Sequence, residues 1–162
     1  WKDGLMSVST DIKKQLVTSI GALSTVQTVY GYEELDPNGW PAVWVTTSNL
    51  NGSFVTTAEN RRVYGFNVMC LFPLGEDFVK DNSIQRVEYA ENTLNDVVDL
   101  IINLTDDKTF ITTLNAIYSA GDTTVLFVDA ADAEWGTVDM QKGKAKGVQI
   151  TLLINTDYNV TT

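Results

Sequence analysis

Two stretches of the chain carry apolar residues at helical spacing. Six residues near the start recur every three or four positions and form one stripe on a helix: Leu5, Val8, Ile12, Leu16, Ile20 and Leu23. A longer stripe runs from Ile84 to Leu104, and Asn82 with Gln85 resembles a capping box at its start. The opposite face of this second helix is polar, with Glu88, Asn92, Asn95, Asp96 and Asp99.

Alternation of apolar and polar residues predicts β-strands in the remaining segments. The clearest strand has Tyr64, Phe66, Val68, Cys70 and Phe72 on one face. Shorter runs predict strands over residues 25–32, 43–47, 53–57, 125–128 and 148–154. Turns are expected at 33–39 and 49–53, which both contain Asn-Gly, and a hairpin begins at 142–147.

The order of these elements predicts the fold class. A short helix through residues 110–117, capped by Asp106 or Asp107, completes the order α-β-β-β-α-(α)-β-β. Consecutive strands with helices at separated points favour α+β, a mainly antiparallel sheet covered on one face by two helices. A chain of 162 residues suits one domain spanning residues 1–162.

The amino-acid composition excludes most familiar types of active site. The chain has no histidine and one cysteine, which excludes Ser-His-Asp and Cys-His catalysis, zinc fingers and an intrachain disulfide. Cys70 lies in an apolar row and is interpreted as a buried small hydrophobe. Glycine-rich phosphate loops are missing too, so no cofactor is expected.

Acidic residues dominate the charge. Eleven Lys and Arg against 21 Asp and Glu give a formal net charge of −10, which disfavours direct binding to nucleic acid. No apolar run approaches the length of about 20 residues that spans a bilayer, and the start lacks a signal-peptide pattern, so no membrane association is expected.

Three carboxylates, Asp129, Asp132 and Glu134, are expected in a loop before Trp135. Their oxygens suit a hard cation, but the spacing lacks the EF-hand pattern, so a metal is not expected. Adjacent acidic pairs elsewhere in turns favour capping or solvation over glycosidase chemistry. The protein is therefore not expected to be an enzyme.

Basic residues and tryptophans form the other candidate contacts. Arg61 and Arg62 open the long strand, and Lys142, Lys144 and Lys146 lie in the hairpin; these islands suit either an acidic partner surface or the protection of a sheet edge. Tryptophans in or beside turns are either core residues or interface anchors, namely Trp40, Trp44 and Trp135.

Three segments, together with the size and the first helix, carry a resemblance to a known family: Arg-Arg-Val-Tyr-Gly-Phe-Asn-Val at 61–68, Ala-Glu-Asn-Thr-Leu-Asn-Asp-Val-Val-Asp at 90–99 and Gly-Val-Gln-Ile-Thr-Leu at 147–152. In these features the chain resembles the tail-terminator, or tail-completion, proteins of long-tailed bacteriophages of the lambda type. This resemblance implies a structural virion protein that forms a hexameric ring. The ring caps the tail tube, ends its polymerisation and joins the tail to head-completion proteins. Such a protein assembles in the host cytoplasm and resides at the tail–head junction.

A ring of this kind gives the acidic charge a use, because carboxylates facing the channel repel passing DNA without binding it. Either Asp129, Asp132 and Glu134 or the acidic face of the second helix then lines the channel. The basic islands join neighbouring subunits or the tube. Alternatives are a neighbouring neck protein of similar fold, a monomeric carbohydrate- or peptide-binding module using Trp40 and Trp44, and an enzyme that uses only carboxylates.

Overall fold

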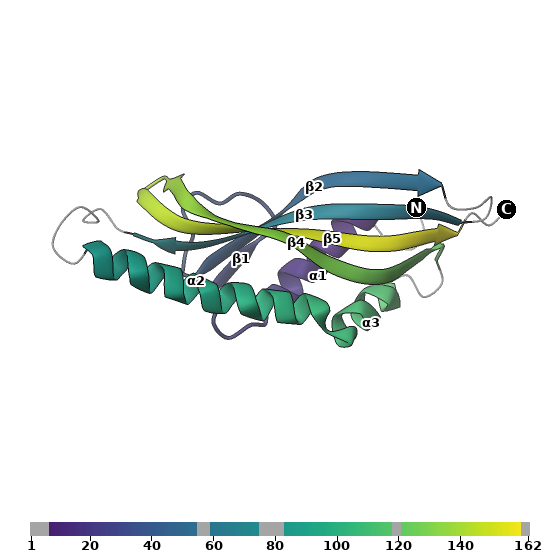
Figure 1. The fold of residues 1–162 in the computed structure, drawn as a ribbon, viewed down its shortest axis with the longest axis horizontal. Helices are drawn as coiled ribbons and strands as arrows, with labels where there is room; N and C mark the ends of the chain where they lie inside the picture. Colours follow the sequence, from purple (N-terminus) through teal and green to yellow (C-terminus); the bar gives the residue numbers. More distant parts are fainter. Residues whose placement is uncertain (1–6, 55–58, 75–82, 118–120, 160–162) are drawn as a thin grey trace.

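A computed structural model describes residues 7–54, 59–74, 83–117 and 121–159 of the protein. These residues form three helices and five strands (Figure 1). The helices are α1 (Val8–Gly21), α2 (Ser83–Asp106) and α3 (Lys108–Ile117). The strands are β1 (Thr28–Tyr30), β2 (Ala42–Phe54), β3 (Glu59–Pro73), β4 (Thr123–Met140) and β5 (Gly143–Asn159).

The strands form one sheet with the order β1-β2-β3-β5-β4. The pairs β2–β3, β3–β5 and β4–β5 are antiparallel, and only the short β1 runs parallel to its neighbour among the described strands. The predicted α+β class and element order are therefore confirmed, with the short third helix present. β1 and β4 lie on opposite edges of the sheet.

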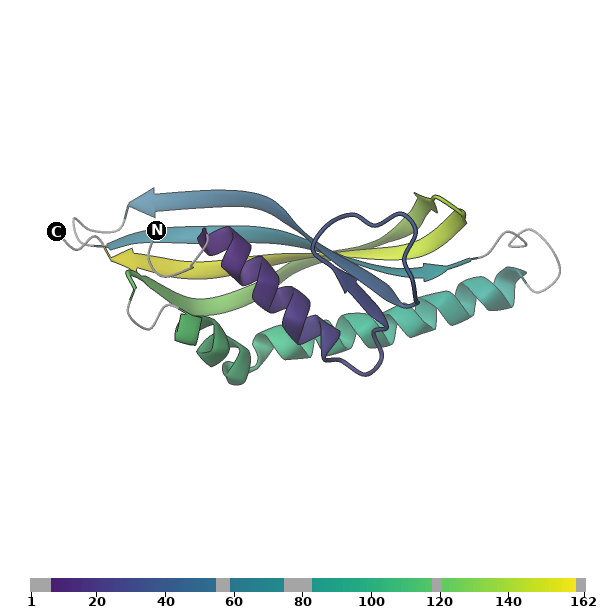
Figure 2. The same cartoon turned by 180° about the vertical axis from the view of Figure 1, so that it is seen from behind.

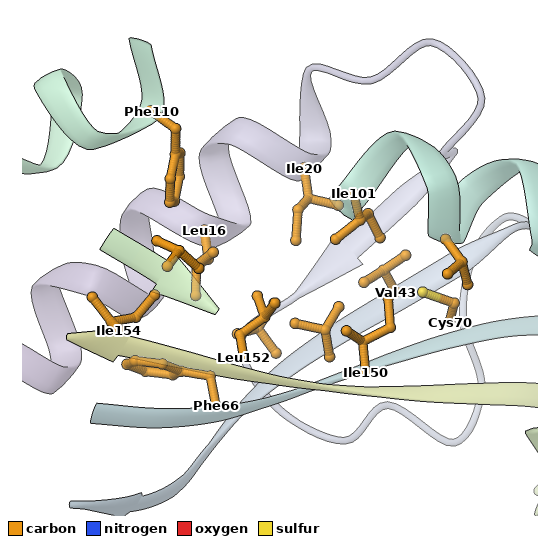
Figure 3. Packing of buried hydrophobic residues seen from close by; sticks show 14 of the residues in the cluster. Leu16, Ile20, Val43, Phe66, Cys70, Ile101, Phe110, Ile150, Leu152 and Ile154 are labelled. Atoms are coloured by element: carbon orange, nitrogen blue, oxygen red, sulfur yellow. The ribbon is translucent and has the colours of Figure 1, made fainter. Parts of the chain in front are cut away.

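All three helices lie on the same side of the sheet in both views (Figures 1 and 2). The α1 stripe is buried at Ile12, Leu16 and Ile20, as its spacing predicts. These residues, with Ile101 of α2 and others, pack on the alternating apolar row of β3 and its neighbours (Figure 3). Burial of these apolar faces against each other is the main stabilising contribution to the fold.

A smaller apolar cluster occupies the opposite face of the sheet. It consists of Trp44, Leu71 and Ala145, which alternate along their strands with residues of the main core. The segment between β1 and β2 reaches the β4–β5 hairpin, because the Gln141 amide donates to the Leu35 carbonyl over 3.0 Å. This segment covers one end of that face.

Local sequence signals explain several boundaries. Ser7 caps α1, since its hydroxyl accepts from the Thr10 amide, and Asp107 caps α3 by accepting from the Thr109 amide over 2.8 Å. Gly143 follows the β4–β5 turn with φ of 100°, a region that favours glycine. Asn82, the first residue of the expected capping box, lies outside the described residues.

Two predicted irregular segments are wrong. Residues 49–53 are part of β2 and not a turn, because the pairing with β3 continues past a register shift between Thr47 and Leu50. The segment that contains Asp129, Asp132 and Glu134 is part of β4 and not a loop. In both places pairing with a long neighbouring strand overrides weak β-propensity.

Candidate functional site

The two groups of basic candidates lie at opposite ends of the sheet. Arg61 and Arg62 are near the start of β3 and pair with Asp157 and Thr156 at the end of β5. Lys142 is in the hairpin turn, and Lys144 and Lys146 belong to the start of β5 (Figure 1). The structure does not bring these two groups together into one basic patch.

Most of these basic side chains pair with acidic groups of the same chain. Arg61 contacts Asp157 at 3.3 Å. The hairpin lysines form three further ion pairs, Lys142–Asp36 at 3.6 Å, Lys144–Asp139 at 3.2 Å and Lys146–Glu91 at 3.9 Å. Lys144–Asp139 joins opposite residues of the β4–β5 hairpin, whereas the other three pairs join segments far apart in the chain. Well-exposed pairs such as Lys142–Asp36 and Lys144–Asp139 contribute about 0–1 kcal/mol each.

Arg62 lies on the helix-covered face of the sheet and stacks on an aromatic ring. Its guanidinium carbon lies 3.9 Å from the centroid of Tyr158, a cation–π geometry. The Arg62 carbonyl accepts a hydrogen bond from the Thr156 hydroxyl over 3.0 Å. The adjacent Arg61 points to the opposite face, so the two arginines cannot act as one binding pair.

The three candidate tryptophans have different environments. Trp44 is 5% exposed and belongs to the smaller apolar cluster, against which the partly buried Trp40 packs. Trp135 of β4 is 45% exposed. Trp44 is therefore a packing residue, and it is not exposed for the contact that a binding module based on Trp40 and Trp44 would need.

The acidic candidates of β4 share one face of the sheet. Asp129, Asp132 and Glu134 pair across the strand with Leu153, Thr151 and Gln149, which point away from the helices. A spacing of three normally puts side chains on opposite faces of a strand, but a register shift between Ala130 and Asp132 restores the alignment. All three carboxylates are exposed.

The β4 carboxylates are not paired with basic side chains in the described part of the chain. None of the three forms an ion pair with any residue in the described ranges. Within the described part of the chain there is also no group of three acidic, cysteine or histidine side chains placed to hold a metal ion. The β4 carboxylates thus form an acidic row and not a chelating cluster.

Helix α2 presents a second acidic surface. Glu88, Asn92, Asn95, Asp96 and Asp99 are all exposed, as the polar face of the predicted helix requires. The helix is 24 residues long and runs beneath most of the sheet (Figure 1). Its acidic stripe is therefore an extended surface.

Sequence reasoning missed the apolar surface of β4. Leu126, Phe127 and Trp135 are 37%, 50% and 45% exposed. A signal was present in the run Val125 to Val128, because four consecutive apolar residues cannot all face the core of an alternating strand. A register shift between Val125 and Phe127 puts this run at an irregular point of the strand.

Cys70 is buried in the main core, as predicted. Burial raises the pKa of its thiol to about 12. The thiolate, which is the reactive form, is therefore disfavoured at neutral pH.

The fold and its surfaces define an α+β protein with helices on one face of its sheet and two surfaces that carry several exposed carboxylates. A scan against models of protein families finds no match, and a search of curated proteins finds no relative. None of the described helices combines the length and apolar character needed to cross a membrane.

Proposed function

We propose that the protein is a structural component of a bacteriophage tail that forms a hexameric ring at the end of the tail tube. The ring stops further polymerisation of the tube protein and offers a surface to the head-completion proteins. DNA passes through its acidic channel without being specifically bound. The subunit acts by assembly and not by catalysis, and its place is the tail–head junction of the virion.

The observation that carries this proposal is the separation of uncompensated acidic charge onto extended surfaces. The β4 row and the α2 stripe each hold several exposed carboxylates, and six copies with a charge of −10 total about −60. A surface of this sign lowers the local affinity for phosphates, which suits a passage through which DNA must slide.

The basic islands suit contacts at the two ends of the ring. The hairpin lysines and Arg61 lie at opposite ends of β5, and its 17 residues span roughly 55 Å. A subunit standing upright in a ring would present one island to the tail tube and the other to the head side. We assign the tube contact to Lys142, Lys144 and Lys146.

The test is incubation of the protein with polymerising tail tubes of the phage that encodes it, followed by negative-stain imaging. We expect a ring at one end of each tube and tubes that stop lengthening. The triple variant Lys142→Ser, Lys144→Ser and Lys146→Ser should keep the ring but lose attachment to the tube. The control Lys108→Ser changes an exposed lysine of α3 and should attach normally.

Tubes that lengthen unchanged and carry no ring would contradict the proposal. Binding to head-completion proteins without binding to tubes would instead favour a neighbouring neck protein. Attachment that survives the triple lysine substitution would remove the hairpin from the tube contact.

A further inference from the structure

The β4 flank of the molecule has the composition of a protein interface. β4 is the last strand in the sheet order, so its outer edge has no neighbouring strand within the described residues. Phe127 of β4 is exposed on the same face as the acidic row, because it pairs with Asn155, which points away from the helices. Leu126 is exposed at the register shift beside it, and Trp135 is exposed on the opposite face of the strand, where it pairs with Val148. Aromatic residues of this kind are enriched at contacts between proteins.

A pocket that contains two lysines lies on the opposite flank of the molecule. It has a volume of about 370 Å³ and lies on α1, lined by Lys13, Lys14, Val17, Thr18 and Gly31. Neither lysine forms an ion pair with a described residue. The pocket therefore places beside Val17 two lysines that no described acidic side chain pairs with.

The two flanks lie on opposite sides of the molecule. α1 contacts β1 and β2 at one edge of the sheet, and β4 forms the other edge. β4 is in front in Figure 1, whereas α1 is in front when the molecule is seen from behind in Figure 2. Two different patches on opposite sides join copies head to tail, and such a contact closes a ring when the rotation between copies allows it.

We propose that the β4 flank of one copy docks on the α1 pocket of the next copy. In this contact Asp129, Asp132 and Glu134 face Lys13 and Lys14, and the exposed β4 side chains are covered. This inference rests on the proposed ring. It also leaves the acidic stripe of α2 to line the channel, because the β4 row is then occupied by the neighbouring subunit.

A pair of charge-swapped variants tests the contact. The first carries Lys13→Glu and Lys14→Glu, and the second carries Asp129→Lys, Asp132→Lys and Glu134→Lys. Each variant alone places like charges opposite each other at the contact. We therefore expect each to need a protein concentration at least tenfold higher than the wild type needs to form rings. Mixed in equal amounts, the two variants restore opposite charges at every contact and should form rings of alternating subunits.

Matched controls separate this contact from a general effect of charge. Lys108→Glu removes another exposed lysine, and Glu88→Lys with Asp96→Lys and Asp99→Lys reverses the α2 stripe. Both controls should form rings on their own. Circular dichroism and thermal unfolding of every variant identify any that fails to fold, and restoration by mixing requires both swapped variants to be folded.

The results are read by native mass spectrometry and imaging, with the wild type as reference. Rings from the mixture but not from either swapped variant support the contact. The contact is overturned if both swapped variants form rings alone, or if their mixture forms none. In either case a ring formed by the wild type leaves the proposed function standing. A wild type that forms no ring, either free or on tail tubes, overturns both.

Discussion

Cys70 shows at the scale of one residue how burial controls chemistry. Its side chain is fully buried beside Val43 and Val148 of the neighbouring strands. Figure 3 shows its sulfur within the core beneath the helices. The unfolded chain exposes the thiol and lets it ionise near its ordinary pKa of 9.0, whereas the folded chain holds the pKa at about 12.

This difference predicts a stability that depends on alkaline pH. The raised folded-state pKa means that the contribution of Cys70 is fully present below pH 9.0 and is lost as pH rises towards about 12. At about pH 10.5 the loss is about 2 kcal/mol. Cys70→Ala removes this titration but leaves a small cavity, which costs about 1 kcal/mol at neutral pH.

Urea unfolding of the wild type and of Cys70→Ala, measured at pH 7 and at about pH 10.5, checks this prediction. The wild type should be the more stable protein at pH 7, and the variant should be the more stable at about pH 10.5. The same stability difference at both pH values would show that the thiol is not buried in the folded state.

At the scale of elements, Asn115 joins α3 to the free edge of β4. Its side-chain amide donates to the Val125 carbonyl over 3.0 Å, and its oxygen accepts from the Val125 amide over 2.7 Å. These are the two backbone groups that an adjacent strand would otherwise pair. The Asn115 side chain thus satisfies both outward-facing backbone groups of Val125, at the point where the register of β4 shifts.

Asn115→Ala should therefore destabilise the protein by about 1–3 kcal/mol, because both backbone groups of the buried Val125 lose their partners. Hydrogen exchange of the Val125 amide should accelerate more than exchange in β3. Thr113→Ala is the matched control in the same helix, since it removes an exposed hydroxyl bonded to the Thr109 carbonyl. Equal stability losses in the two variants would contradict the role of Asn115.

The elements that the sequence predicts well are those with strong periodicity. The stripes of α1 and α2 and the alternation from Tyr64 to Cys70 each identify a buried face correctly. The segments at 49–53 and 129–134 contain residues with weak β-propensity, and their strand structure depends on pairing with partners far along the chain.

The candidate surfaces are less predictable for the same reason. Ion pairs such as Lys146–Glu91 and Arg61–Asp157 join residues 55 and 96 positions apart, so local sequence patterns cannot reveal them. The shared face of the β4 carboxylates depends on a single register shift. The acidic residues themselves were visible in the sequence, but their alignment was not.

At the scale of the whole molecule, the chain is elongated, with its helices beneath one face of the sheet and different surfaces on its two flanks (Figures 1 and 2). Uncompensated carboxylates lie on β4 and α2, while the basic islands are held at the ends of β5. The proposed ring would use these separate surfaces for contacts with neighbours, for the channel and for partners at its two ends. The proposal that follows from this distribution is assembly of the subunits into a ring.

Native mass spectrometry of the full chain across a series of concentrations tests this claim most directly. Six copies of the 17.9 kDa chain weigh about 107 kDa, and we predict a closed species of that mass with a central hole in negative-stain images. A chain that stays at 17.9 kDa at every concentration, and forms no ring when tail tubes are added, would contradict the account.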